Sequence, residues 1–119
     1  MDYDLHIVRT RNWLDAARAP ITKEDADVVV VADPELEWLP SGVVAVPGLV
    51  WPDFIICWRG APCFWWHRDQ ISCKDPNEAQ KKKMIEIARV LSAYVVGDED
   101  EIYDLRKSIF GRETVIFSR

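Results

Sequence analysis

The chain has 119 residues, of which 49% are hydrophobic and 29% charged, values typical of one globular domain. Its formal net charge of −5 argues against general attraction to nucleic acid or anionic membranes, because both attract clustered lysine and arginine. We therefore expect neither a nucleic-acid partner nor a membrane partner.

The sequence carries no recognisable export signal. The start, Met1-Asp2-Tyr3-Asp4, is acidic and lacks the basic and apolar parts of a signal peptide. The longest apolar runs, such as residues 28–32, are too short to cross a bilayer. Cys57, Cys63 and Cys73 are odd in number, which favours reduced thiols in a reducing compartment. We expect a cytoplasmic protein.

The first third of the chain predicts a strand and then a helix. Residues 3–10 alternate between apolar and polar side chains, as in a strand. Thr22 and Asp25 have the spacing of an acidic capping box, which predicts a helix from about Lys23 to Ala32. The β-branched run at 28–31 would also suit a buried strand. We favour the helix, which Asp33-Pro34 would end.

The middle of the chain predicts consecutive strands. Residues 43–46 look like a short strand, and residues 54–59 and 62–67 form an aromatic pair joined at Gly60-Ala61. A reversal at 68–70 would return the chain as a third strand over residues 71–74. The result is a run of antiparallel neighbours.

A long helix should begin at Asp75-Pro76-Asn77-Glu78. This segment offers an N-cap aspartate, proline at the first helical position and glutamate three residues after the cap. The helix should end by Tyr94. Its predicted core face comprises Met84, Ile87, Ala88, Leu91 and Val95. Its predicted solvent face comprises Lys81, Lys82, Lys83, Glu86 and Arg89.

The remaining segment is less regular. Val95 and Val96 should start a strand that is broken at Gly97, residues 103–109 are ambiguous between helix and loop, and residues 113–118 alternate like a closing strand. The fold class predicted for residues 1–119 is a single α+β domain. It consists of an antiparallel sheet, a meander, with about two helices packed on one face.

Two chemical interpretations remain as alternatives. Cys57, Cys63, His67 and Cys73 could bind zinc in a regulatory domain, although they lack the close pairs of familiar sites. A small enzyme could use His67 or a cysteine, with a histidine as base for a thiol. Because neither a glycine-rich phosphate loop nor a nucleophile elbow is present, we predict no catalytic residue, cofactor or metal.

Binding features are easier to identify. Phe64, Trp65 and Trp66 are consecutive, so a strand sends them to both faces of the sheet. One face should meet the helices. The other either forms an exposed aromatic patch with Trp58 and Phe54 or is covered as well.

Residues 98–101 read Asp-Glu-Asp-Glu, and Asp104 follows closely. A charge run of this kind is usually a solvated loop. Here it could also pair with the lysines and arginines of a basic partner and speed their encounter. The candidate partner contacts are Trp66, Arg68, Asp98, Glu99, Asp100, Glu101 and Asp104.

The chain also resembles a group of small bacterial proteins. The resemblance is carried by residues 3–9, Trp13, 21–22, 33–36, 71–72, 84–88 and 97–98, and it extends to about Asp104. Residues 28–31 depart from it. Members of that group look like immunity proteins of polymorphic or contact-delivered toxin systems. The resemblance implies that this protein binds and neutralises a cognate toxin domain with a basic surface, without catalysis.

Overall fold

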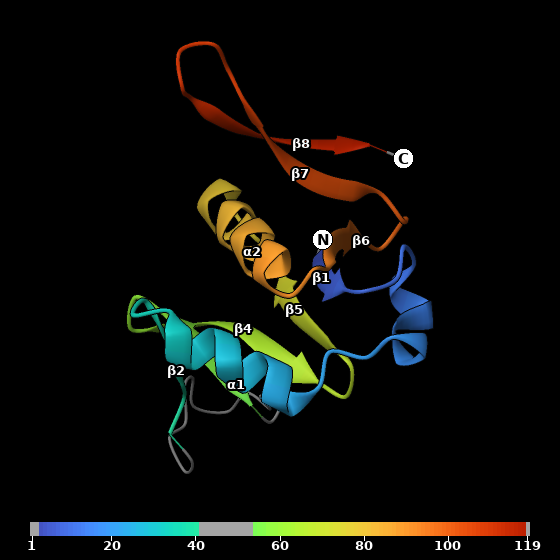
Figure 1. Ribbon diagram of the computed structural model, residues 1–119, viewed down its shortest axis with the longest axis vertical. Helices are drawn as coiled ribbons and strands as arrows, with labels where there is room; N and C mark the ends of the chain where they lie inside the picture. The colour runs from blue at the N-terminus through green and yellow to red at the C-terminus, as the bar shows by residue number, and fades with distance from the viewer. Residues whose placement is uncertain (1–2, 41–53, 119) are drawn as a thin grey trace.

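The computed structural model describes residues 3–40 and 54–118, and Figure 1 shows their arrangement. The elements are β1 (Asp4–Val8), η1 (Trp13–Arg18), α1 (Lys23–Ala32), β2 (Leu36–Trp38), β3 (Ile55–Trp58), β4 (Ala61–His67), β5 (Gln70–Lys74), α2 (Glu78–Val90), β6 (Tyr94–Gly97), β7 (Ile102–Lys107) and β8 (Glu113–Ser118). The predicted strand at 43–46 lies outside the described residues. The α+β fold class is confirmed.

The described strands form one antiparallel sheet in the order β2-β3-β4-β5-β1-β6-β7-β8. It contains two meanders, β2 to β5 and β6 to β8, and the first strand of the chain lies between them. Leu5 of β1 pairs with Cys73 of β5 on one side and with Gly97 of β6 on the other. Both meanders therefore depend on β1 for their connection.

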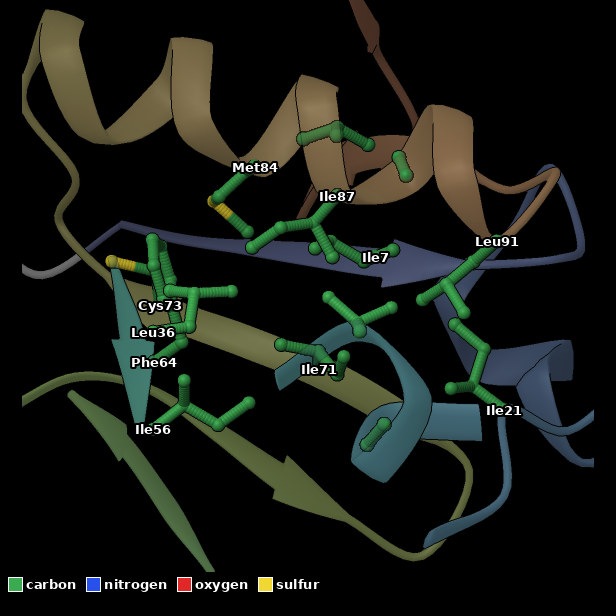
Figure 2. Packing of buried hydrophobic residues seen from close by; sticks show 14 of the residues in the cluster. Ile7, Ile21, Leu36, Ile56, Phe64, Ile71, Cys73, Met84, Ile87 and Leu91 are labelled. Atoms are coloured by element: carbon green, nitrogen blue, oxygen red, sulfur yellow. The ribbon is translucent and has the colours of Figure 1, made fainter. Parts of the chain in front are cut away.

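The two α-helices cover one face of the sheet and enclose the main core. Met84 and Ile87 of α2 point toward Ile7 and Ile71 of the sheet (Figure 2). This arrangement confirms the predicted pair of helices on one face. Each contributes an apolar stripe whose burial favours folding.

The α1 prediction is confirmed at both ends. Thr22 caps the helix through a capping box with Asp25, and the helix ends at Ala32. Only Val29 and Val30 of the valine run are buried, while Val28 and Val31 are exposed. The local cap therefore outweighs the β propensity of these valines.

The opposite face of the sheet carries the 3-10 helix η1. Val8 and Val96 form a small second core with Ala16, and Trp13 packs against it. His6 lies on the same face as Val8, because alternate residues of a strand point to opposite faces. This smaller core places η1 beside the polar side chains described below.

The predicted N-cap of α2 is wrong by two residues. Asn77 caps the helix through a reciprocal capping box with Gln80. Asp75 instead has a positive φ of 46°, and its amide donates to the carbonyl of Tyr3 at 2.9 Å. This hydrogen bond to Tyr3, the residue just before β1, therefore holds Asp75 in a turn before the helix begins.

Lys83 is also corrected. It was predicted to face solvent, but it is buried, with Nζ 2.6 Å from Asp33 and 3.2 Å from Glu35. Burial alone would lower the pKa of Lys83, but the hydrogen bonds to the two carboxylates raise it above its usual value. Lys83 therefore joins α2 to the segment that connects α1 and β2.

The sequence pattern of residues 103–109 does not distinguish helix from loop, whereas the structure has β7 over Ile102–Lys107. Val95 of β6 pairs with Tyr103, and all six residues of β7 pair with β8. The predicted closing strand over residues 113–118 is confirmed as β8. Within residues 3–40 and 54–118, none of the helices combines the length and the apolar character needed to cross a membrane.

Candidate partner-binding surface

The acidic residues 98–101 form a closed turn between β6 and β7, which we call the acidic turn. The amide of Gly97 donates to the carbonyl of Glu101 at 2.9 Å, and the amide of Asp100 donates to the carbonyl of Gly97 at 3.1 Å. Asp100 adopts a positive φ of 66°, which aspartate tolerates better than most residues. Asp98, Glu99 and Asp100 are exposed. The turn thus presents three carboxylates on an ordered backbone.

Glu101 behaves differently from its neighbours, because its side chain is buried. The hydroxyl of Tyr3 donates a hydrogen bond to its carboxylate. Burial and this bond hold the pKa of Tyr3 well above its usual value, so the phenol keeps its proton. Glu101 fastens the acidic turn to the body of the protein and is not a surface contact.

Asp98 fastens the other end of the acidic turn. Its Oδ1 lies 3.0 Å from Nε2 of His6, and its Oδ2 accepts from the amide of Asp4 at 3.3 Å. Asp98 remains partly exposed, so its carboxylate can still face a partner. Both ends of the turn are therefore bonded to residues at the beginning of the chain.

His6 joins Asp98 to Ser72 of β5. The ring Nδ1 lies 3.0 Å from the Ser72 hydroxyl oxygen, and the ring stacks on Trp13 with centroids 4.7 Å apart. A serine, a histidine and an aspartate in one chain of hydrogen bonds is the constellation of acyl-transfer enzymes. Ser72, however, is only 4% exposed, and a nucleophile must come within about 3 Å of the reacting atom. We interpret the Ser72–His6–Asp98 series of hydrogen bonds as a support for the acidic turn.

Asp104 lies beyond the acidic turn, on β7. Its Oδ1 is 3.0 Å from Nη2 of Arg89 on α2, and both side chains are well exposed. An exposed pair of this kind adds little stability. Asp104 can therefore exchange this partner for another cation at small cost.

Trp66 and Arg68 lie apart from the acidic turn. Ile71 of β5 pairs with Ile7, near the C-terminal end of β1. Gly97, which precedes the acidic turn, pairs with Leu5, near the N-terminal end of β1. Arg68 is exposed in the β4–β5 turn, at the Ile71 end. The seven predicted contacts thus form two separate groups rather than one surface.

Trp66 itself has a structural role. Its indole Nε1 donates to the carbonyl of Ile21 at 2.8 Å, its ring packs against the main core, and Phe54 lies edge-on to it at 5.5 Å. Phe54 is half exposed, so it is the outer member of this aromatic group. The tryptophan holds the start of α1 against the sheet.

Cys63 and Cys73 interact through their thiols, but the residues of the two alternative chemistries do not come together as one site. His67 is exposed at the end of β4 and lies four residues from Cys63 on the same strand, a separation of about 13 Å in extended chain. Cys57 and Cys73 are buried. In the described part of the chain, no group of three or more His, Cys, Asp or Glu side chains is arranged to hold a metal ion.

Sequence reasoning missed two exposed apolar residues, Ile109 and Phe110, in the turn between β7 and β8. The only signal is a pair of large apolar residues between Ser108 and Gly111, a pattern typical of a turn rather than a core segment. Comparisons of the chain with protein-family models, with curated proteins and with solved structures gave no match.

Proposed function

We propose that this protein is an immunity protein, which binds a cognate bacterial toxin domain in the cytoplasm of the producing cell and neutralises it by protein–protein contact. The resemblance to immunity proteins motivates the proposal. The surface contacting the toxin is the acidic turn, with Asp98, Glu99 and Asp100 facing a basic patch. Neutralisation follows from covering the active site or the substrate path of the toxin, and it needs no chemistry from this chain.

The observation that carries this proposal is the double fastening of the acidic turn. His6 holds Asp98, and Tyr3 holds the buried Glu101. A charged loop that is already ordered loses little conformational entropy when it binds, which favours tight association. Exposed charges of one sign also raise the rate of encounter with an oppositely charged partner.

Asp104 extends the acidic surface along β7. Its exposed ion pair with Arg89 can open when a lysine or arginine of the toxin approaches, because exposed pairs are weak. Trp66 and Arg68 are not part of this contact, since they belong to the other end of the sheet.

Co-expression with a toxin encoded by a neighbouring gene tests the proposal. The wild-type protein should protect the cells and should bind the purified toxin domain with an association rate that falls as salt increases. The variant Asp98→Asn/Glu99→Gln/Asp100→Asn should associate at least tenfold more slowly. The asparagine at 98 keeps one oxygen that can accept from His6 and gives up only the longer bond from the amide of Asp4, so the turn should remain folded.

The matched control is Asp15→Asn/Glu24→Gln/Glu37→Gln, in which three other exposed carboxylates are neutralised. It changes the net charge by the same amount but leaves the acidic turn intact, so it should retain protection and most of the association rate. Failure of the wild-type protein to protect the cells would rule out the proposed function. Equal effects of the two triple variants would rule out the acidic turn as the toxin contact.

A further inference from the structure

The hairpin formed by β7, its turn and β8, residues 102–118, projects from the body of the protein, and we call it the arm (Figure 1). Its turn, residues 108–112, is ordered by its own backbone. The amide of Ser108 donates to the carbonyl of Arg112 at 2.8 Å, and the amide of Gly111 donates to the carbonyl of Ser108 at 2.9 Å. The Ser108 hydroxyl accepts from the amides of Phe110 and Arg112. Gly111 supplies the positive φ of 82° that closes the turn.

This ordered turn presents two large apolar side chains to solvent. Ile109 is 95% exposed and Phe110 is 90% exposed. Arg106, Lys107 and Arg112, all exposed, flank them in the sequence, and the acidic Glu113 pairs with Lys107 across the hairpin. An aromatic anchor on an ordered turn, beside more cations than anions, is the composition of a binding element, since burial of the anchor supplies energy and the charges supply specificity.

A complementary groove lies between the two α-helices. It has a volume of about 300 Å³ and is lined by Val29, Ala32, Asp33, Pro34, Glu86, Ile87 and Val90. One of the lining apolar residues, Val90, is itself 66% exposed. Asp33 and Glu86 supply carboxylates at its edge. Nζ of the buried Lys83 lies 2.6 Å from Asp33 and 3.7 Å from Glu86, and the Glu86 side chain is the more exposed of the two, at 61%. The groove is therefore apolar inside and acidic at its rim.

We propose that the arm of one copy of this protein docks in the helix groove of a second copy. Phe110 enters the apolar groove, and the cations beside it approach Asp33 and Glu86. Because the chain as a whole is acidic, the arm turn is a place where two copies can meet with attraction instead of repulsion. Charge complementarity thus selects a second copy as the occupant.

The geometry favours exchange between copies over docking within one. In Figure 1 the arm turn lies at the top of the long axis, above α2, while α1 lies in the lower half. Each copy carries one arm and one groove, so reciprocal docking about a two-fold axis satisfies both and closes the assembly as a dimer.

Sedimentation velocity over a wide range of protein concentration tests this dimer. The wild-type protein should convert from monomer to dimer as concentration rises, and Ile109→Ser/Phe110→Ser should remain monomeric. Leu14→Ser, which removes an exposed apolar side chain on η1, should dimerise like the wild type. Circular dichroism confirms that each variant is folded.

Charge-reversal variants, and mixtures of two variants with different defects, test the contact itself. Arg112→Glu and Glu86→Lys should each weaken dimerisation by roughly tenfold, and the two changes in one chain should restore it. A monomeric Phe110→Ser variant mixed with a monomeric Val90→Lys variant should form heterodimers, because Val90 lines the groove and the mixture retains one intact arm and one intact groove.

Two outcomes would overturn the inference. One is a wild-type protein that stays monomeric at every concentration. The other is a dimer that persists in Ile109→Ser/Phe110→Ser, as expected if copies paired through the β8 edge instead. Neither outcome bears on the acidic turn, so the proposed toxin contact is tested independently.

Discussion

Nε2 of His6 lies 3.0 Å from Oδ1 of Asp98, and the same ring reaches Ser72 through Nδ1. One side chain of β1 therefore links β5 to the acidic turn. Because β1 lies between the two meanders, the position of the exposed carboxylates depends on the strand that unites the sheet.

His6→Phe should lower the free energy of unfolding by about 1–3 kcal/mol, because it leaves the buried Ser72 hydroxyl without its partner. The phenyl ring can still stack on Trp13. Urea denaturation measures the change. Ser72→Ala should cost less in the His6→Phe background than in the wild type, and equal costs in both would show that the two side chains do not interact.

Gly97→Ala should be among the most damaging small substitutions. A Cβ at this position would overlap the carboxylate of Glu101 and crowd the hydroxyl of Tyr3. Since both groups are held in place, we expect a loss of about 3 kcal/mol or more. Thermal denaturation measures it.

Gly60→Ala is the matched control. Gly60 has a φ of 82° but open space around the missing Cβ, so only the backbone strain of about 1 kcal/mol applies. An equal loss at the two positions would contradict the close packing of Glu101 beneath Gly97.

Glu35 should contribute to the pH dependence of stability. Hydrogen bonds from Arg59 and then Lys83 lower the pKa of Glu35 to about 2, below its value of about 4.3 in the unfolded chain. Its ionised form therefore stabilises the fold above the unfolded pKa, and this contribution is lost as the pH falls toward 2. Burial is the largest single effect on the pKa of Asp33 and raises it, but the hydrogen bonds from Lys83 and from the amide of Glu35, together with the Lys83 charge, lower this pKa below its usual value.

Glu35→Gln should consequently be less stable than the wild type near neutral pH, and the difference should shrink between about pH 5 and pH 2. Urea denaturation at a series of pH values measures it. Glu37→Gln, at a neighbouring exposed position, controls for the loss of one charge. A difference that stays constant across this pH range would contradict the role of Glu35.

Cys63 should be the most reactive of the three cysteines. A hydrogen bond from the Cys73 thiol lowers the pKa of Cys63, and the same bond with burial raises the pKa of Cys73. Burial also raises the pKa of Cys57. Because the thiolate is the reactive form, iodoacetamide should label the half-buried Cys63 first, as measured by peptide mass spectrometry.

Cys73→Ala should slow labelling of Cys63, because it removes the hydrogen bond that stabilises the thiolate. Cys57→Ala should change the rate little. Faster labelling of Cys57 or Cys73 in the wild type would show that access to the buried strands governs reactivity instead of thiol acidity.

The elements that were predicted correctly share one property: the residues that mark each of them lie within a few positions of one another in the sequence. The capping box of Thr22 and Asp25 marked the start of α1, and the aromatic pair around Gly60 marked β3 and β4. The α2 cap shows the limit. Asp75 has a suitable residue type and spacing, but its amide bonds to Tyr3, more than seventy residues earlier, so Asn77 takes the role.

In the candidate surface, too, some features follow from local sequence and others from long-range contacts. Sequence alone indicated that a dense acidic run follows a strand and that all four residues 98–101 should be exposed, which holds for Asp98, Glu99 and Asp100. Only the tertiary structure decided that Glu101 is buried against Tyr3, 98 positions away, that Lys83 docks between two carboxylates, and that the exposed Phe110 stands on an arm. Such pairings depend on which distant segments the folded chain brings together, and local propensity and periodicity do not encode that information.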